Sequence, residues 1–212
     1  MNEMQIQSLQ ILETRVPGVV STHGEQDDTH LVQASQRGNQ DAFALLVQRH
    51  QRRVFNMSVR MLQDPEEANE ATQEAFLAAW RGLPTFRGEA QFSSWLYRIS
   101  YNCCFRVLEA RKQEQTLQVT LQAEQTLPQH SNEQQAMENI EQQERRVLVR
   151  EQLEQLPAKY RIVLILRHLQ DRTYEEMADI LTMPIGTIKT HLFRARNLLK
   201  ERVLAQYLRG PV

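Results

Sequence analysis

Glycine and proline are scarce in this chain of 212 residues, which contains seven of each. Sandwiches and barrels need many tight turns, so this scarcity argues against an all-β fold and favours long helices. Hydrophobic residues make up 41% of the sequence. That share is low for one large compact domain, and two small domains, or one domain with tails, fit the length better.

Cysteine is rarer still, because Cys103 and Cys104 are the only two. Adjacent cysteines rarely satisfy disulfide geometry, and two thiols alone cannot complete a cysteine-rich zinc site. We therefore expect no disulfide-stapled secreted scaffold, and we place the chain in a reducing cytoplasm. Both thiols are expected to be small buried hydrophobes rather than redox sensors.

Long apolar runs and catalytic motifs are missing as well. No stretch approaches the roughly 18 uncharged apolar residues of a membrane span, and no secretory signal is recognisable. His50, His168 and His191 have no metal-ligand spacing with acids or thiols, and there is no phosphate-binding glycine loop or nucleophile elbow. The sequence predicts a protein that is not an enzyme, without cofactor, metal or membrane insertion.

The charge is nearly balanced, with 25 Lys and Arg against 26 Asp and Glu and a formal net charge of −1. This balance argues against a surface coated in basic residues for indiscriminate nucleic-acid binding. It leaves room for a local basic face, so the distribution of charge along the chain matters more than its sum.

Periodicity and composition divide the chain into four parts. Residues 1–26 are mixed in character and predict an N-terminal extension. Strong helical periodicity predicts a first helical domain over 27–112 and a second over 146–208. Residues 113–145 are rich in Gln and Glu with no aromatics, which is typical of a flexible polar linker. The predicted fold is therefore all-α, with two small helical domains.

The clearest helix start lies in the first domain, at Asp64-Pro65-Glu66-Glu67. It combines a capping Asp, a Pro at the first helical position and acids against the positive end of the helix dipole. A stripe of small and aromatic residues follows at three- and four-residue steps and predicts close helix approach: Ala68, Ala71, Ala75, Phe76, Ala79 and Trp80.

The most specific local pattern lies near the C-terminus and has the form of a helix-turn-helix. Residues 173–181 suit a first helix, Thr182-Met183-Pro184 a turn, and residues 185–192 a second helix. The apolar residues expected to hold the helices together are Met177, Ala178 and Leu181 on the first and Ile188, Leu192 and Ala195 on the second. The first helix is acidic, whereas the second and its continuation carry Lys189, Arg194, Arg196, Lys200 and Arg202 against only Glu201.

A helix of net positive charge suits a phosphate backbone and base edges in the major groove. Thr187 and its backbone N–H, at the helix start, are predicted to bind phosphate. Lys189, Thr190 and Arg194 lie at steps of one and four and can share one exposed face. Any one of these cations alone is equally consistent with a solvated surface helix, but the whole pattern favours DNA binding.

Both halves of the chain, in order, resemble a bacterial sigma-70-family protein of the extracytoplasmic-function (group IV) class. The resemblance covers residues 27 to about 205. The C-terminal stretch from residues 156–161 through 186–196 resembles sigma region 4. Ala71-Thr72-Gln73-Glu74-Ala75-Phe76-Leu77-Ala78-Ala79-Trp80 resembles region 2.2, and residues 86–88 with 92–102 resemble regions 2.3 and 2.4.

This resemblance implies partners and site residues. Region 4 would read the −35 promoter element and touch the polymerase β-flap, which assigns DNA contacts to Thr187, Lys189, Thr190, Phe193, Arg194 and Arg196. Regions 2.3 and 2.4 would open and hold the −10 element, which assigns Phe86, Arg87, Arg98, Tyr101, Asn102 and Arg106. Region 2.2 would dock on the β′ coiled coil of core RNA polymerase through Glu70, Gln73 and Glu74. An anti-sigma factor is a further expected partner.

The residues themselves support a −10 role for the loop near Phe86. An extruded base needs a flat partner, a cation for its phosphate and a backbone free to approach, and Phe86, Arg87 and Gly88 supply these. The alternative is that the aromatic rings only fill the core. We favour the core for Phe92 and Trp95, whereas Phe86 and Arg87 are open to either role.

Two other functions share some of these features. A DNA-binding regulator that does not join polymerase would have the same helix-turn-helix, but its N-terminal half should sense a ligand or phosphate. A helical scaffold with a solvated basic face would have no salt-sensitive DNA affinity. The region 2.2 pattern and the aromatic-basic loop favour a promoter-specificity subunit over both.

Overall fold

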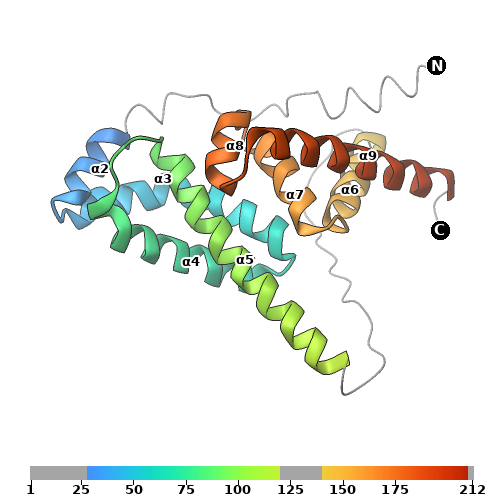
Figure 1. Ribbon diagram of the computed structural model, residues 1–212, viewed down its shortest axis with the longest axis horizontal. Helices are drawn as coiled ribbons and strands as arrows, with labels where there is room; N and C mark the ends of the chain where they lie inside the picture. Colours follow the sequence, from blue (N-terminus) through green and yellow to red (C-terminus); the bar gives the residue numbers. More distant parts are fainter. Residues whose placement is uncertain (1–27, 120–139, 210–212) are drawn as a thin grey trace.

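The computed structural model describes residues 28–119 and 140–209 (Figure 1). Within these ranges the regular elements are all helices and no strand occurs, which confirms the all-α prediction. None of the described helices is both long and apolar enough to cross a membrane. The predicted extension over 1–26 and most of the predicted linker lie outside the described residues.

The first helical unit contains four α-helices. They are α2 (Asp28–Gln36), α3 (Gln40–Leu62), α4 (Pro65–Gly82) and α5 (Phe92–Val119), with a short 3-10 turn, η1 (Leu83–Thr85), after α4. Helices α3, α4 and α5 pack against one another, and α2 covers the start of α3. The C-terminal part of α5 runs past residue 112, the predicted end of the domain, and projects beyond the other helices (Figure 1).

The second unit begins with α6 (Ile140–Glu154) and contains the helix-turn-helix. Its other elements are α7 (Ala158–Leu164), the π-helical segment η2 (Ile165–Leu169), α8 (Tyr174–Leu181) and α9 (Ile185–Arg209). Helix α9 packs on α6, α7 and α8. Most of the apolar residues predicted to join α8 and α9 are buried: Met177, Leu181, Ile188, Leu192 and Ala195.

Small residues let α4 lie close to both of its neighbours. Ala68, Ala71, Ala75 and Ala79 are between 0% and 3% exposed, so the stripe faces the core as predicted. The helix starts where the sequence indicates, because the Asp64 side chain accepts hydrogen bonds from the backbone N–H groups of Glu66 (2.8 Å) and Glu67 (3.0 Å). The cap satisfies two donors that have no partner within the helix.

The start of α8 is fixed by a reciprocal cap. The Thr173 hydroxyl accepts from the Glu176 N–H at 3.2 Å, and the Glu176 carboxylate accepts from the Thr173 N–H at 2.7 Å. This capping box satisfies two backbone donors at once. It therefore sets where the helix-turn-helix begins.

The two units lie against each other. Helix α8 packs on the N-terminal half of α5, and α7 approaches α3 (Figure 1). The sequence predicts two domains joined by a polar tether, but it gives no sign that the domains touch. This contact places the N-terminal half of α5, in the first unit, beside the helix-turn-helix of the second.

The Asp64 cap gives a test of the fold. Asp64→Ala removes the acceptor for two backbone donors, and we expect the free energy of unfolding to fall by about 1 kcal/mol. Chemical denaturation measures this change. Asp64→Ser, which keeps a capping oxygen, should lose only part of it, and Asn69→Ala at an exposed mid-helix position should lose none. Equal stability of Asp64→Ala and the parent chain would contradict the capping role.

Candidate nucleic-acid interface

The exposed face of α9 carries most of the residues predicted to contact the −35 element. Lys189, Thr190, Phe193 and Arg194 are all exposed, and Phe193 is 67% exposed. An exposed aromatic ring beside two cations offers both an apolar and a charged contact to a partner. The structure thus gathers these four predicted residues on the accessible part of the helix-turn-helix.

The start of α9 is less open than the sequence suggests. The Thr187 N–H donates to the Pro184 carbonyl at 2.9 Å, so this amide is already satisfied within the first turn. The predicted phosphate contact of Thr187 stays a prediction, and its side chain is half-buried. The Thr190 hydroxyl donates to the Gly186 carbonyl at 2.9 Å and keeps its acceptor capacity.

Arg196 lies at one edge of this group, because it follows Lys189 by seven residues and so projects from nearly the same side of the helix. Its guanidinium lies 3.5 Å from His168 Nε2. Burial lowers the pKa of His168, and the charges of Arg196 and Arg167 lower it further. Burial likewise lowers the pKa of His191, with Lys159 and Arg194 contributing, so both imidazoles favour the neutral form near neutral pH.

The loop between η1 and α5 holds the first of the predicted −10 residues. Phe86 packs on Trp95, with ring centroids 4.8 Å apart, and meets Phe92 edge-on at 6.2 Å. Phe92 is buried at 5% exposure, in agreement with its predicted core role, while Phe86 is half-buried. Arg87 is fully open, with 84% of its side chain exposed.

A hollow of about 410 Å³ lies between this loop and α2. Its walls include Gln33 and Gln36 from α2 and Phe86, Arg87 and Gly88 from the loop. Gln36 pins the loop, because its Nε2 donates to the carbonyls of Leu83 (3.0 Å) and Phe86 (2.7 Å). Gly88 adopts a left-handed φ of 72°, which side chains rarely tolerate. The volume falls within the roughly 300–1,000 Å³ of small-molecule sites.

A buried ion-pair network supports the floor of this hollow. Asp28 Oδ2 lies 2.6 Å from His50 Nε2, and Arg49 donates to Asp28 Oδ1 at 3.0 Å. The His50 ring meets the edge of Phe92 at 5.4 Å. Sequence reasoning missed this network, since Asp28 and His50 are far apart in the chain and neither lies in a recognisable motif.

Helix α5 presents the other predicted −10 residues. Arg98, Asn102 and Arg106 are exposed, as their four-residue spacing predicts. Tyr101 is half-buried and lies 5.9 Å from the exposed ring of Phe105. Burial raises the pKa of the Tyr101 hydroxyl, which therefore keeps its proton.

The residues predicted to dock on polymerase lie directly beside α5. Glu70, Gln73 and Glu74 are exposed on α4, and Glu74 pairs with Arg106 at 2.7 Å. A predicted protein contact and a predicted DNA contact thus share one ion pair. Both partners are more than half exposed, so the pair contributes little stability and is easily exchanged for other partners.

The two cysteines are buried on the inner side of α5, at 1% and 0% exposure. The Cys104 thiol donates to the Ser58 hydroxyl at 3.4 Å. Burial raises the pKa of Cys104 to about 11, and burial also raises that of Cys103. In the described parts of the chain, no group of three His, Cys, Asp or Glu side chains is arranged to hold a metal ion.

Comparison with known sequences gives matches over both units. Residues 46–114 match the family model of sigma-70 region 2, and residues 146–199 match that of sigma-70 region 4. The chain is 36% identical over 194 residues to the RNA polymerase sigma-H factor of Pseudomonas aeruginosa, covering 87% of this chain and 97% of that relative. It is 34% identical over 183 residues to the ECF RNA polymerase sigma-E factor of Escherichia coli, covering 83% and 94%.

Solved structures give a consistent fold. The chain is similar, at a TM-score of 0.61 and 21% identity, to the sigma factor RpoE in complex with the anti-sigma factor NepR from Bartonella quintana, over 76% of this chain and 96% of that one. It is equally similar, at 0.61 and 22% identity, to CnrH in complex with the cytosolic domain of CnrY, over 84% and 97%. At this identity the likeness concerns the fold alone.

The cysteines give a test of this part of the structure. A pKa of about 11 in place of 9.0 for Cys104 leaves about a hundredfold less thiolate near neutral pH, so alkylation of Cys104 in the native chain should be at least that much slower than in an unfolded one. Mass spectrometry after timed iodoacetamide treatment measures the rate. Because its pKa is raised on folding, the Cys104 thiol contributes stability at pH values below its pKa in the unfolded chain. That contribution is lost as the pH rises through its pKa in the folded chain. Rapid native alkylation at pH 7 would contradict the burial.

Proposed function

Because the chain belongs to the sigma-70 family of RNA polymerase sigma factors, in the extracytoplasmic-function class, we propose that its two helical units divide promoter recognition between them. Its role is to bind core polymerase, direct it to promoters and support promoter melting. The observation that carries this function is that both family regions occur in order and the relatives match over nearly their whole length.

The second unit recognises the −35 element. Lys189, Thr190, Phe193 and Arg194 occupy the open face of α9, which is the second helix of a helix-turn-helix and enters the major groove in proteins of this architecture. Arg is suited to bidentate contact with guanine, and the Phe193 ring to the thymine methyl group. Thr187 and Arg196 flank this face and are suited to backbone phosphates.

The first unit recognises the −10 element. The hollow beside Phe86 and Arg87 has room for an extruded base, with an aromatic wall, a cation for the phosphate and a glycine for close approach. Arg98, Asn102 and Arg106 then follow the strand along the exposed face of α5, with Tyr101 as a partly open stacking surface.

The exposed acidic face of α4 binds core polymerase. Glu70, Gln73 and Glu74 are accessible to the β′ coiled coil, while region 4 contacts the β-flap. Since Glu74 also pairs with Arg106, docking that engages the carboxylate would release the guanidinium for DNA. The protein contact and the −10 contact are adjacent in this assignment, which suits a subunit that melts DNA only when bound to polymerase.

Other features of the protein follow from the same assignment. It has no catalytic activity of its own, because polymerase performs the chemistry, and it acts in the bacterial cytoplasm. An anti-sigma protein is a further partner, as NepR is for the similar RpoE. Its working domains are 27–112 and 146–208, joined by 113–145.

Reconstitution with core polymerase on a promoter library tests the function directly. The expected result is core binding and transcripts that start downstream of a shared −10 and −35 motif. Sequence-specific DNA binding without core binding and without transcripts would contradict the sigma assignment in favour of a separate DNA-binding regulator. Absence of both DNA and core binding would contradict both.

The −35 assignment is tested by Arg194→Ala. Loss of a base contact should weaken binding of the reconstituted polymerase to its promoter by about 1–3 kcal/mol and relax specificity at one −35 position. Fluorescence anisotropy with matched and scrambled −35 elements measures both effects. Lys200→Ala, a change of a cation outside the predicted contact set on the same helix, is the control. A loss confined to −10 melting would mean that the two units have been assigned each other's roles.

A further inference from the structure

Gln36, the last residue of α2, lines the hollow beside Phe86 with an amide whose donors are both used. Its Nε2 donates to the carbonyl of Leu83 at 3.0 Å and to that of Phe86 at 2.7 Å. A primary amide has two N–H donors, so neither is left for another partner. The remaining polar atom of this side chain is the oxygen Oε1, which can only accept a hydrogen bond.

The orientation of the Gln36 amide is fixed by its two partners. Both are backbone carbonyls, which accept hydrogen bonds and cannot donate them. A half-turn of the amide would place Oε1 where Nε2 now lies, next to two other oxygens with no hydrogen between them. Because the two carbonyls belong to one short segment, Leu83 to Phe86, the loop and the amide hold each other in place. Oε1 is therefore an acceptor in a defined position.

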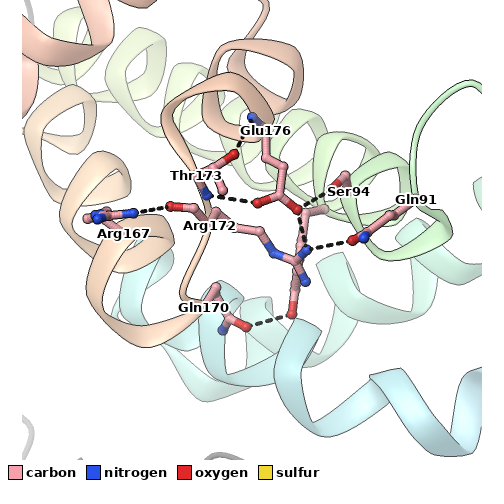
Figure 2. A network of polar contacts seen from close by, with 8 residues as sticks. Gln91, Ser94, Arg167, Gln170, Arg172, Thr173 and Glu176 are labelled. Carbon is pink, nitrogen blue, oxygen red and sulfur yellow. Dashed lines mark hydrogen bonds and ion pairs between the residues drawn. The ribbon is translucent and has the colours of Figure 1, made fainter. Parts of the chain in front are cut away.

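Other acceptors on the wall of the hollow are already engaged. Both carboxylate oxygens of Asp28 have partners, one of them His50 at 2.6 Å. Oε1 of Gln91 accepts from the Arg172 guanidinium at 3.3 Å (Figure 2). In contrast, Oε1 of Gln36 accepts no hydrogen bond from any residue that the structure describes. It is thus a fixed acceptor in the wall that is open to a ligand.

Helix α2 is attached at both of its ends, which makes the position of this acceptor rigid. At the start of α2, Asp28 pairs with His50 and Arg49 of α3. At its end, Gln36 bonds to the loop. Gln33 also lines the hollow, but its side chain is exposed and its amide can turn to donate or accept. Discrimination between ligands needs a contact group that is held in place, and Gln36 meets this condition.

A fixed acceptor distinguishes two chemical kinds of base. Adenine and cytosine carry an amino group on the edge where guanine and thymine carry a keto oxygen. An extruded base presents its Watson–Crick edge to the pocket that holds it. An amino group donates to Oε1, whereas a keto oxygen would lie against another acceptor and lose its hydrogen bond to water.

Guanine and thymine also have a ring N–H beside the keto oxygen. The Phe86 carbonyl, which lies 2.7 Å from Nε2 of Gln36, adds a second acceptor oxygen next to Oε1. Two neighbouring acceptors suit an amino group, which has two hydrogens, and disfavour a keto group at the same place. The wall formed by Gln36 and Phe86 is therefore complementary to an amino-bearing base.

We propose that Gln36 is a specificity-determining residue, through which the hollow binds an amino-bearing base of the −10 strand, adenine or cytosine, in preference to guanine or thymine. This inference rests on the proposed function, in which the hollow holds an extruded base, and it deepens that function by naming the chemical class of the base. The amide then has two tasks, since its nitrogen holds the loop and its oxygen contacts the base.

Base analogues that lack only the amino group test this contact. Single-stranded −10 oligonucleotides, with the motif found from the promoter library, are bound to polymerase reconstituted with this chain and compared by fluorescence anisotropy. Unsubstituted purine replaces adenine, or 2-pyrimidinone replaces cytosine, at one position at a time. At one position the loss of the amino group should weaken binding to the parent chain by about fivefold. Gln36→Lys keeps donors for both loop carbonyls but has no acceptor, so the same loss should cost it nothing.

Two further variants serve as controls. Gln48→Lys makes the same change of charge at an exposed glutamine outside the hollow, and it should keep the fivefold difference. Gln36→Met removes the donors as well as the acceptor, so it should lose the difference and also weaken binding of every oligonucleotide, because the loop is no longer held. An equal cost of amino deletion in the parent chain and in Gln36→Lys at every position would overturn the inference.

Abasic replacement separates this inference from the proposed function. If removal of a whole base costs affinity at some position but no amino deletion does, the hollow holds a base that Gln36 does not select, and only the inference is wrong. If removal of a whole base costs nothing at any position, the hollow holds no base, and the −10 assignment of the hollow is wrong as well.

Discussion

The buried guanidinium of Arg172 has partners in both helical units, because it donates to Glu176 in the second unit and to Gln91 in the first and lies over the Tyr97 ring. Removing either set of partners would leave a charge in a poorly solvated place, which is strongly unfavourable. The position of the helix-turn-helix against the first unit therefore depends on this side chain. Arg161 adds a second point of attachment by capping the carboxyl end of α3. The relative placement of the two proposed promoter-reading faces thus depends on these two arginines as well as on apolar packing.

Within the first unit the corresponding constraint is the close approach that the alanine stripe of α4 allows. With Ala71, Ala75 and Ala79 turned inward, the opposite face of α4 is left to polar residues, and α5 lies close enough for Glu74 to reach Arg106. The proposed polymerase surface and the proposed −10 surface are neighbours for that reason. One set of small residues thus explains both the packing of the domain and the adjacency of its two proposed sites.

Much of this could be predicted from the sequence, because it depends on local periodicity. The Asp64 cap, the alanine stripe, the buried face of the helix-turn-helix and the exposed face of α9 all follow from residues three or four apart. The roles of Asp28, His50 and Arg172 could not be predicted, since each depends on partners that only the tertiary fold brings together. The hydrogen bond from the Thr187 amide to the Pro184 carbonyl was not predicted either, because it is a detail of turn geometry that periodicity does not contain.

The central claim is that the two units act on different elements of one promoter when the chain is bound to core polymerase. A photoreactive amino acid placed at Arg98 or at Arg194, both exposed, would locate each unit on the DNA by crosslinking in the complex with core polymerase and promoter DNA. Crosslinks near the −10 element from position 98 and near the −35 element from position 194 are predicted. Crosslinks from both positions to the same element would contradict the account.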